Sequence, residues 1–354
     1  MKNIIGKILL LMLLVCSSCS SIYRFSVEVQ EPALITLPVS AQNVLILNNT
    51  VAQPMDQGIE RNINGVSIPV DYPLSLDSTV WSAIDEIAVI LDESNFFNTI
   101  AIYRDSVRDD NEWFSMTHLS PELQYELYDS ENIDALFVIE RIFLFLKEDV
   151  KPIINGAPTS EQTAFLDLRA DGVITCSMYI YGDEKPLITF HASDSLISKA
   201  MMYNDSITFF KEIPEYMLND LAIELGNKVA KYFIPTWKTE RRSLFVNFNS
   251  RMQEAVGYAA DNRWANAESI WITELVKKTK PVEKAKIAFN LAVANEMQDR
   301  FEASLEWLHK AKEYMERIKK DNNLQEIELI NNYISKIEIR IENNKLLDIQ
   351  WGKE

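Results

Sequence analysis

The hydrophobic pattern of this chain changes near residue 245, and no other feature constrains the fold as strongly. Before that point, apolar runs of strand length alternate with stretches whose apolar residues recur every three to four positions. From about residue 250 onward only the helical spacing remains. The first pattern predicts a mixed sheet with packed helices, of the α+β or α/β class, and the second predicts an all-α region.

The first region predicts elements in the order β-α-β-α-β-β-β-α. Residues 134–146 are apolar on both faces, as a central strand covered on both sides must be. Ser120 and Pro121 suit the N-cap and first position of a helix, whereas 60–75 is loop-like. The expected strands are 44–47, 98–103, 134–146, 173–181 and 187–190, and the expected helices begin near 77, near 120 and at 214.

The helical region contains an internal repeat with an offset of 37 residues, measured from Trp264 to Phe301. In each copy a small residue follows the aromatic by three positions, and larger apolar residues come next. This pattern resembles the tetratricopeptide repeat, in which small residues let two helices approach closely; a generic helical bundle is the alternative. Residues 323–351 are expected to form a long helix that caps the stack. The signature residues are Trp264, Ala267, Trp271, Phe301, Ser304 and Trp307.

The N-terminus has the pattern of an export signal. Lys2 and Lys7 flank the start of an apolar run over 8–15, which is too short for a mature span of about 20 residues. The following residues resemble a bacterial lipobox, with small residues before Cys19, so the resemblance implies lipidation at Cys19. Simple cleavage is the alternative. Because no acidic cluster follows Cys19, we expect a lipid anchor that faces the periplasm, at the outer membrane.

These observations predict four segments and an uneven charge. The segments are a signal peptide (1–18), a lipidated tether (19–35), an α/β domain (36–245) and a tetratricopeptide-like domain (246–354). The formal net charge is −17; residues 19–245 contain 16 basic and 34 acidic side chains, whereas 246–354 contain 17 and 18. Such acidity excludes nucleic acid as an expected partner.

The search for chemistry yields no catalytic motif. Only 9 glycines and 3 histidines are present, and the histidines have no metal-binding spacing, so we expect no metal and no cofactor. Glu140 and Arg141 interrupt the most apolar strand and point to opposite faces, so each needs another partner. Pairing in a structural role is favoured over catalysis there. Cys176 is expected to be a small buried hydrophobe.

Four tripeptides begin with Asp, continue with Ser and end with Thr or an aliphatic residue. They resemble the acceptor used by Bacteroidetes for periplasmic O-glycosylation, although composition and helix capping explain the pattern equally well. The implied acceptors are Ser78, Ser106, Ser195 and Ser206.

The mature chain resembles an uncharacterised family of Bacteroidetes-type lipoproteins with a domain of unknown function and a tetratricopeptide-like C-terminal region. Residues 44–49, 233–237 and the Trp264 signature support this resemblance. The strand–helix order also resembles the α/β domains of the curli-secretion lipoprotein and of the TolB amino terminus. That second likeness is fold analogy and does not imply function.

We therefore expect a membrane-anchored, non-enzymatic lipoprotein that binds an envelope protein or peptide, with the nearly neutral tail as the first place to look for the partner. Two alternatives stay open: a carboxylate-dependent envelope enzyme acting on glycans, and an oligomeric secretion or assembly component.

Overall fold

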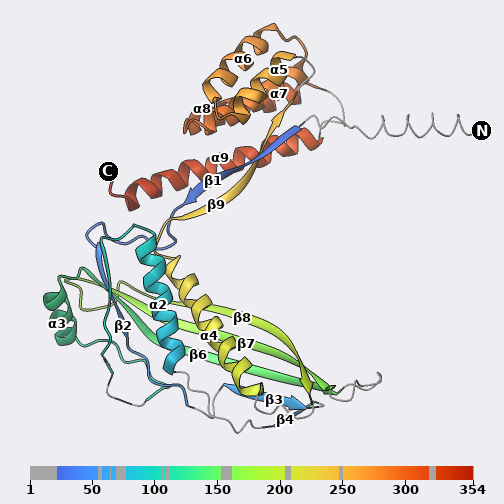
Figure 1. Ribbon diagram of the computed structural model, residues 1–354. Helices are drawn as coiled ribbons and strands as arrows, with labels where there is room; N and C mark the ends of the chain where they lie inside the picture. The colour runs from blue at the N-terminus through green and yellow to red at the C-terminus, as the bar shows by residue number, and fades with distance from the viewer. Residues whose placement is uncertain are drawn as a thin grey trace, which may run out of the picture. The chain divides into compact units, whose positions relative to one another are not determined.

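In the computed structural model the chain forms two compact units (Figure 1). The α/β unit comprises Pro32–Thr236 and Ile349–Glu354, and the helical unit comprises strand β1 together with Trp237–Asp348. The described residues are 22–54, 58–63, 65–68, 77–105, 107–108, 110, 112–152, 162–203, 209–246, 250–318 and 324–353.

The α/β unit is built on a seven-stranded mixed sheet. Strand β2 lies between β5 and β6 and pairs in parallel with both. The long strands β6, β7 and β8 form an antiparallel meander, and the far half of β6 pairs in parallel with β3. The strands are β2 (Asn43–Asn48), β3 (Ile59–Ile63), β4 (Val66–Ile68), β5 (Thr99–Ile102), β6 (Ala135–Pro152), β7 (Gln162–Ile180) and β8 (Ile188–Tyr203).

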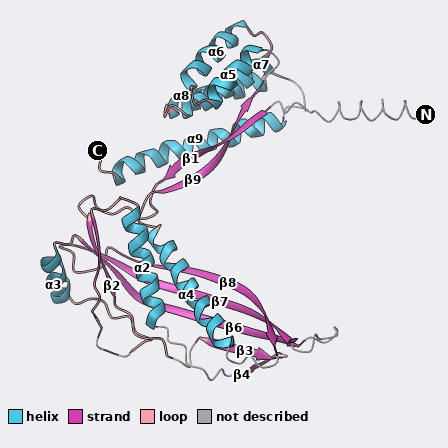
Figure 2. Cartoon of the chain, in the orientation of Figure 1, coloured by secondary structure: helices cyan, strands magenta, loops and turns pink. Residues whose placement is uncertain are grey.

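Helices cover the two faces of this sheet unequally. Helices α2 (Asp77–Glu93) and α4 (Phe209–Ala230) pack against each other on one face (Figure 2). The opposite face carries α3 (Pro121–Glu131), which packs over β2. The Ser120 hydroxyl accepts a hydrogen bond from the Leu123 N–H at 3.3 Å, so Ser120 caps α3 as expected. The predicted stripe of α2 is fully or almost fully buried: Val80, Ile84, Ile87 and Leu91.

The helical unit contains the predicted succession of helices. The loops before α6 and α8 repeat the same geometry 37 residues apart: the Arg263 N–H donates to the Tyr258 carbonyl, and the Arg300 N–H donates to the Asn295 carbonyl. The helices are α5 (Ser250–Ala260), α6 (Trp264–Lys277), α7 (Pro281–Glu296), α8 (Phe301–Glu316) and α9 (Leu324–Gln350). The predicted fold class, a mixed sheet with packed helices followed by a helical region, is confirmed.

Three details differ from expectation. The segment 60–75, expected as a loop, contributes to β3 and contains β4. Residues 19–35, expected as a tether, contain β1 (Ile22–Glu31), which pairs with β9 (Thr236–Phe245) in a separate two-stranded sheet. The hairpin strands extend well beyond 173–190. Strand β1 pairs with β9 and β3 pairs with β6, partners distant in sequence that local patterns do not reveal, and β4 then pairs with its neighbour β3.

Candidate functional site

The parallel strands β5, β2 and β6 create a site of the kind that open α/β sheets use for ligands. Between β2 and β5 the chain forms β3, β4 and then α2, which packs on one face, and between β5 and β6 it forms α3, which packs on the other. Connections on opposite faces leave a crevice at the carboxyl ends of the strands, where ligands usually bind. Here that point lies between β2 and β6.

A β-bulge in β6 places a carboxylate at this point. Ile139 lies opposite Cys176 and Arg141 lies opposite Thr175, so Glu140 is the extra residue in the ladder. The bulge lets Ile139 and Ile142 face the same core although they are an odd number of positions apart. Glu140 faces the side covered by α3, and only 1% of its surface is exposed.

Glu140 is held by neutral partners. Asn49, directly after β2, donates from Nδ2 to Glu140 Oε2 at 2.6 Å, and the same Nδ2 lies 2.7 Å from the Thr117 carbonyl. His118 Nδ1 lies 3.5 Å from Glu140 Oε1 and 3.3 Å from the Tyr179 hydroxyl. Among the described residues no lysine or arginine pairs with Glu140. The predicted need for another partner is therefore met by an amide and an imidazole.

The buried carboxylate shapes the ionisation of its neighbours. Burial, and then the charge of Glu140, raise the pKa of the Tyr179 phenol above its ordinary value. The same two causes raise the pKa of the Cys176 thiol. Both groups therefore stay protonated at neutral pH. Cys176 is completely buried, as expected.

His118 connects this cluster to solvent. Its side chain is 49% exposed, whereas the Glu140 carboxylate behind it is fully buried. A carboxylate that orients an exposed imidazole can bind a polar group or transfer a proton. Sequence reasoning missed this pair because 22 residues separate its members; the only local signal was the charge inside an apolar strand.

Exposed apolar side chains lie on the elements around His118, and we call them the aromatic rim. The rim lies on the loop before α3, on α3 and on the β7–β8 turn. Tyr181 packs edge-on against Tyr128 of α3 at 5.3 Å between ring centroids, and Gln124 Nε2 donates to the Glu184 carbonyl at 3.1 Å. The rim residues are Phe114 (77% exposed), Met116 (37%), Tyr125 (51%), Tyr181 (58%) and Leu187 (47%).

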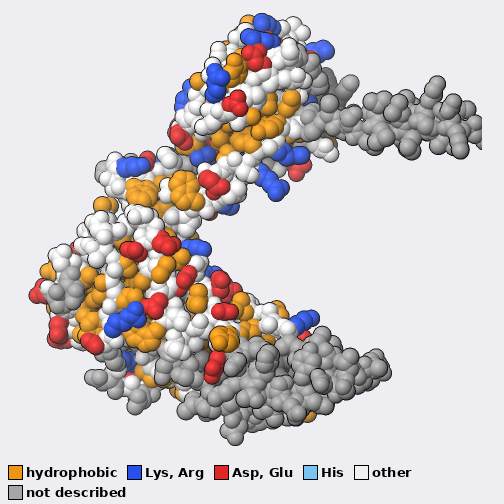
Figure 3. Space-filling model, viewed as in Figure 1, with side chains coloured by type: hydrophobic (Ala, Val, Ile, Leu, Met, Phe, Trp, Pro, Cys, Tyr) orange, Lys and Arg blue, Asp and Glu red, His pale blue; other side chains and the backbone are white. Residues whose placement is uncertain are grey.

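Acidic side chains share these elements with the aromatic rim. Hydrophobic and acidic side chains lie next to one another on the surface of the α/β unit (Figure 3). On α3 and the turn, Lys185 is the single basic residue. The exposed acidic residues there are Glu122, Glu126, Asp129, Asp183 and Glu184.

The residues predicted as sites from sequence do not gather in one place. Ser78 in the first turn of α2 and Ser195 in β8 are exposed, and Cys19, Ser106 and Ser206 lie outside the described residues. His191 Nδ1 lies 2.9 Å from the Thr175 hydroxyl. Within the described ranges no group of three metal-ligating side chains occurs. The repeat residues pack inside the helical unit: Trp264, Ala267, Trp271, Phe301 and Ser304 are buried, and Trp307 is half-buried.

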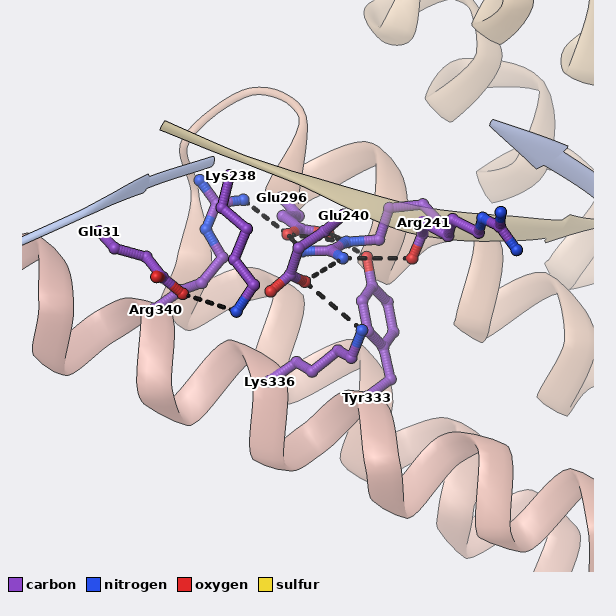
Figure 4. Close-up of polar contacts among 9 residues, drawn as sticks. Glu31, Lys238, Glu240, Arg241, Glu296, Tyr333, Lys336 and Arg340 are labelled. Atoms are coloured by element: carbon purple, nitrogen blue, oxygen red, sulfur yellow. Dashed lines mark hydrogen bonds and ion pairs between the residues drawn. The ribbon is translucent and has the colours of Figure 1, made fainter. Parts of the chain in front are cut away.

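In the helical unit, Glu296 at the end of α7 is also a buried carboxylate (Figure 4). Arg242 of β9 donates to it from Nε at 2.8 Å and from Nη2 at 2.6 Å. Arg340 and Tyr333 of α9 donate to the same carboxylate. Glu240 and Lys336 extend the cluster outward. Charged partners surround Glu296, so the arrangement joins β9, α7 and α9.

Burial alone would raise the pKa of the Glu296 carboxyl. The hydrogen bonds and charge of Arg242, with those of Tyr333 and Arg340, outweigh burial and hold its pKa below the ordinary range. Burial and the charge of Glu296 raise the pKa of Tyr333 far above its usual value. Glu296 therefore stays ionised, and its carboxylate oxygens are occupied by hydrogen bonds from side chains of the same unit, so its role is structural.

No helix among the described residues combines the length and apolarity needed to cross a membrane. A comparison with curated proteins found no match. Among solved structures, three similar chains are a neuraminyllactose-binding hemagglutinin homolog from Helicobacter pylori, a minor lipoprotein from Acinetobacter baumannii and a hypothetical protein from Chlamydia trachomatis. Their identities are 10%, 8% and 13%, with TM-scores of 0.27, 0.24 and 0.23. The matches cover 55%, 54% and 54% of this chain, and 90%, 89% and 98% of the others.

Two families of unknown function match the chain. Residues 253–339, within the helical unit, match the family described as Domain of unknown function (DUF6340). Residues 41–245 match the family described as Domain of unknown function (DUF8603). Because the second match spans more than half of the chain, this protein belongs to the DUF8603 family.

Proposed function

We propose that this protein is a lipid-anchored cell-envelope lipoprotein that binds a partner protein through the aromatic rim around His118. The observation that carries the proposal is the exposure of Phe114, Tyr125 and Tyr181 on the loop, helix and turn of the same unit whose His118 imidazole contacts the buried Glu140 carboxylate. Exposed aromatic side chains are typical of protein interfaces, and a cluster of them on one surface favours a binding role.

The aromatic rim belongs to the α/β unit, whereas the sequence favoured the helical tail as the first place to look for the partner. The aromatic residues of the repeat signature are used for packing there, since Trp264, Trp271 and Phe301 are all buried. The large exposed apolar residues of the helices α5–α9 are aliphatic. Such side chains contribute less to protein recognition than tyrosine and tryptophan do.

The side chains next to the aromatic rim indicate what kind of protein would bind there. Five exposed acidic residues share α3 and the β7–β8 turn with the rim, against a single lysine. A partner with basic residues next to aliphatic ones would match both features. Its association would be fastest at low salt, because complementary charges steer the encounter.

Photocrosslinking in the native envelope tests the proposal on the full, lipidated chain. A benzophenone amino acid is placed at Phe114 or at Tyr181, and at Tyr216 of α4 as the control, since Tyr216 is 68% exposed on another element. We expect one discrete adduct at 114 and 181, absent at 216 and lost when Tyr125 is changed to Ser. Equal adducts at all three positions, or none, would contradict the proposal.

The anchor itself forms a separate part of the proposal. The lipobox resemblance supports lipidation of Cys19, facing the periplasm at the outer membrane, and the repeated loop geometry supports a tetratricopeptide-like helical unit. Replacing Cys19 by Ala should move the chain from the membrane fraction to the soluble fraction. Mass spectrometry of the wild-type N-terminal peptide should show the added acyl chains.

A second candidate function, a carboxylate-dependent envelope enzyme acting on glycans, is favoured by one observation. Glu140 lies 3.5 Å from His118, which is a workable geometry for general acid–base catalysis. If this candidate holds, glycan hydrolysis by the wild type should fall about 10²–10⁴-fold in Glu140→Gln. Crosslinking at Phe114 would persist in that variant, so the two measurements distinguish the enzymatic function from partner binding.

A further inference from the structure

A cavity of about 270 Å³ lies on the other side of the same strand end. It is lined by Asn48 at the end of β2, by Val80 and Trp81 near the start of α2, and by Arg104 after β5. Successive side chains of a strand point to opposite faces, so Asn48 faces this cavity whereas Asn49 faces Glu140. The cavity is therefore distinct from the His118 cluster and lies at the same carboxyl edge of the sheet.

The inner wall of the cavity is apolar and rigid. Val80, Ile142 and Leu144 line it and are at most 6% exposed. Gln53 also lines it, but its side-chain amide is engaged with the backbone of Leu144: Nε2 donates to the carbonyl at 2.9 Å, and Oε1 accepts from the N–H at 3.0 Å. This wall suits the apolar body of a ligand.

The mouth of the cavity presents hydrogen-bond donors. Asn48 Oδ1 accepts from the Thr50 N–H at 3.0 Å and from the Thr50 hydroxyl at 2.8 Å. Asn48 lines the cavity, and with its oxygen accepting both bonds from Thr50, its Nδ2 amide is the group left to donate to a ligand. Among the described residues that line the cavity, Arg104 is the only charged one.

Arg104 is positioned by α2. Its guanidinium lies over the Trp81 ring, with Cζ 5.2 Å from the centroid, and Nη2 donates to Asp85 at 2.7 Å. Only one of its terminal nitrogens is engaged in that hydrogen bond, and the fork geometry leaves further donors for a planar anion. This places a guanidinium, paired on one side with Asp85, at a cavity whose lining is polar around Asn48 and Thr50 and apolar at Val80, Ile142 and Leu144.

We propose that this cavity binds a small amphipathic anion, with an apolar body of about one ring or a short chain and a single carboxylate, sulfonate or phosphate head. The volume is slightly below the range of about 300–1,000 Å³ typical of sites for drug-sized ligands, so the ligand is smaller than those. The head would contact Arg104 and the Asn48 amide, and the body would lie against Val80, Ile142 and Leu144.

The probe for this site is 4-(trifluoromethyl)benzoate, which has one ring and one carboxylate. Fluorine NMR titration of the full chain should show saturable binding at one site per molecule. The neutral analogue 4-(trifluoromethyl)benzyl alcohol should bind at least tenfold more weakly. Decanoate should displace the probe, whereas inorganic phosphate should not, which distinguishes an amphipathic ligand from a free anion.

Three variants locate the binding. Arg104→Gln should weaken the benzoate at least tenfold, and Ala52→Trp, at an exposed position on the cavity wall, should abolish it. Arg169→Gln is the matched control, because Arg169 has an exposed side chain (57%, against 58% for Arg104) and an aspartate partner. Circular dichroism confirms that each variant is folded.

The inference would be overturned by a lack of saturable binding to the folded wild type, or by undiminished binding in both Arg104→Gln and Ala52→Trp. Displacement by phosphate alone would also overturn it, because the apolar wall would then have no role. The crosslinking at Phe114 and Tyr181 is independent of these measurements, so the two proposals fail separately.

Discussion

Glu140 in the α/β unit and Glu296 in the helical unit are both buried carboxylates, but the side chains that contact them differ in kind. Glu296 in the helical unit receives hydrogen bonds from two arginines and a tyrosine (Figure 4). Glu140 in the α/β unit contacts an amide and a half-exposed imidazole. A carboxylate saturated by charged donors has no capacity left for a ligand, whereas one with neutral partners near solvent does. The contrast distinguishes a structural anion from a candidate site.

The largest expected effect is on the structural anion. Glu296→Gln removes the carboxylate that Arg242 and Arg340 share and leaves Glu240 as the remaining partner of Arg242, and breaking a buried ion pair in this way costs about 3–5 kcal/mol. We expect the guanidinium chloride concentration at which the helical unit is half unfolded to fall accordingly. The control is Glu313→Gln, whose exposed pair with Arg317 should contribute at most about 0.5 kcal/mol. Similar losses of unfolding free energy in both variants would show that the buried Glu296 contributes no more to stability than an exposed ion pair does.

Acid should act on the same cluster. The pKa of Glu296 is held below its ordinary value of 4.5 in the folded chain, so its contribution to stability is complete above that value and disappears as the pH falls through the folded pKa. Urea midpoints measured from pH 6 downward should therefore drop below pH 4.5 in the wild type. In Glu296→Gln the drop should be smaller, and equal slopes in the two proteins would refute the assignment.

The matching change at Glu140 should cost much less. Glu140→Gln keeps an oxygen acceptor for Asn49 and removes a charge that no lysine or arginine balances among the described residues. We expect a loss of about 1 kcal/mol or less in unfolding free energy. Tyrosine NMR should show the pKa of Tyr179 moving down toward its usual value, though burial keeps it raised. A loss of unfolding free energy as large as that of Glu296→Gln would show that the two carboxylates are equally structural.

The smallest effect is expected at Cys176. Burial comes first among the causes that raise the pKa of this thiol, and the charge of Glu140 comes second. Glu140→Gln should therefore leave the thiol as unreactive as before toward iodoacetamide at pH 8, with the Cys176 peptide quantified by mass spectrometry. Rapid alkylation in the folded variant would mean that the charge, and not burial, protects the sulfur.

Local patterns predicted the elements whose stabilising contacts are close in sequence. The stripe of α2, the Ser120 cap of α3 and the repeat beginning at Trp264 are all visible as spacing or as residue type. These features depend on neighbours three or four residues away, or on a fixed internal offset. The fold class followed from them.

The candidate site depends on pairings that spacing does not encode. Asn49 and Glu140 are 91 residues apart, and only the parallel pairing of β2 with β6 brings them together. The strand β1 was missed for the same reason, because its partner β9 lies more than 200 residues away. The sequence did show that Glu140 was anomalous, but the identity of its partner required the topology.

Because of the bulge, the side chain at position 140 can change without a change in the strand pairing of the sheet. Since this residue pairs with no residue of β7, replacing its side chain leaves every ladder pair in place. Even its deletion would leave Ile139 and Ile142 two positions apart, so that Ile142, Leu144 and Leu146 would keep their face in a regular strand of the same register. The sheet therefore does not depend on the residue at this position, and related chains can vary the group there and acquire a different reactivity on an unchanged sheet.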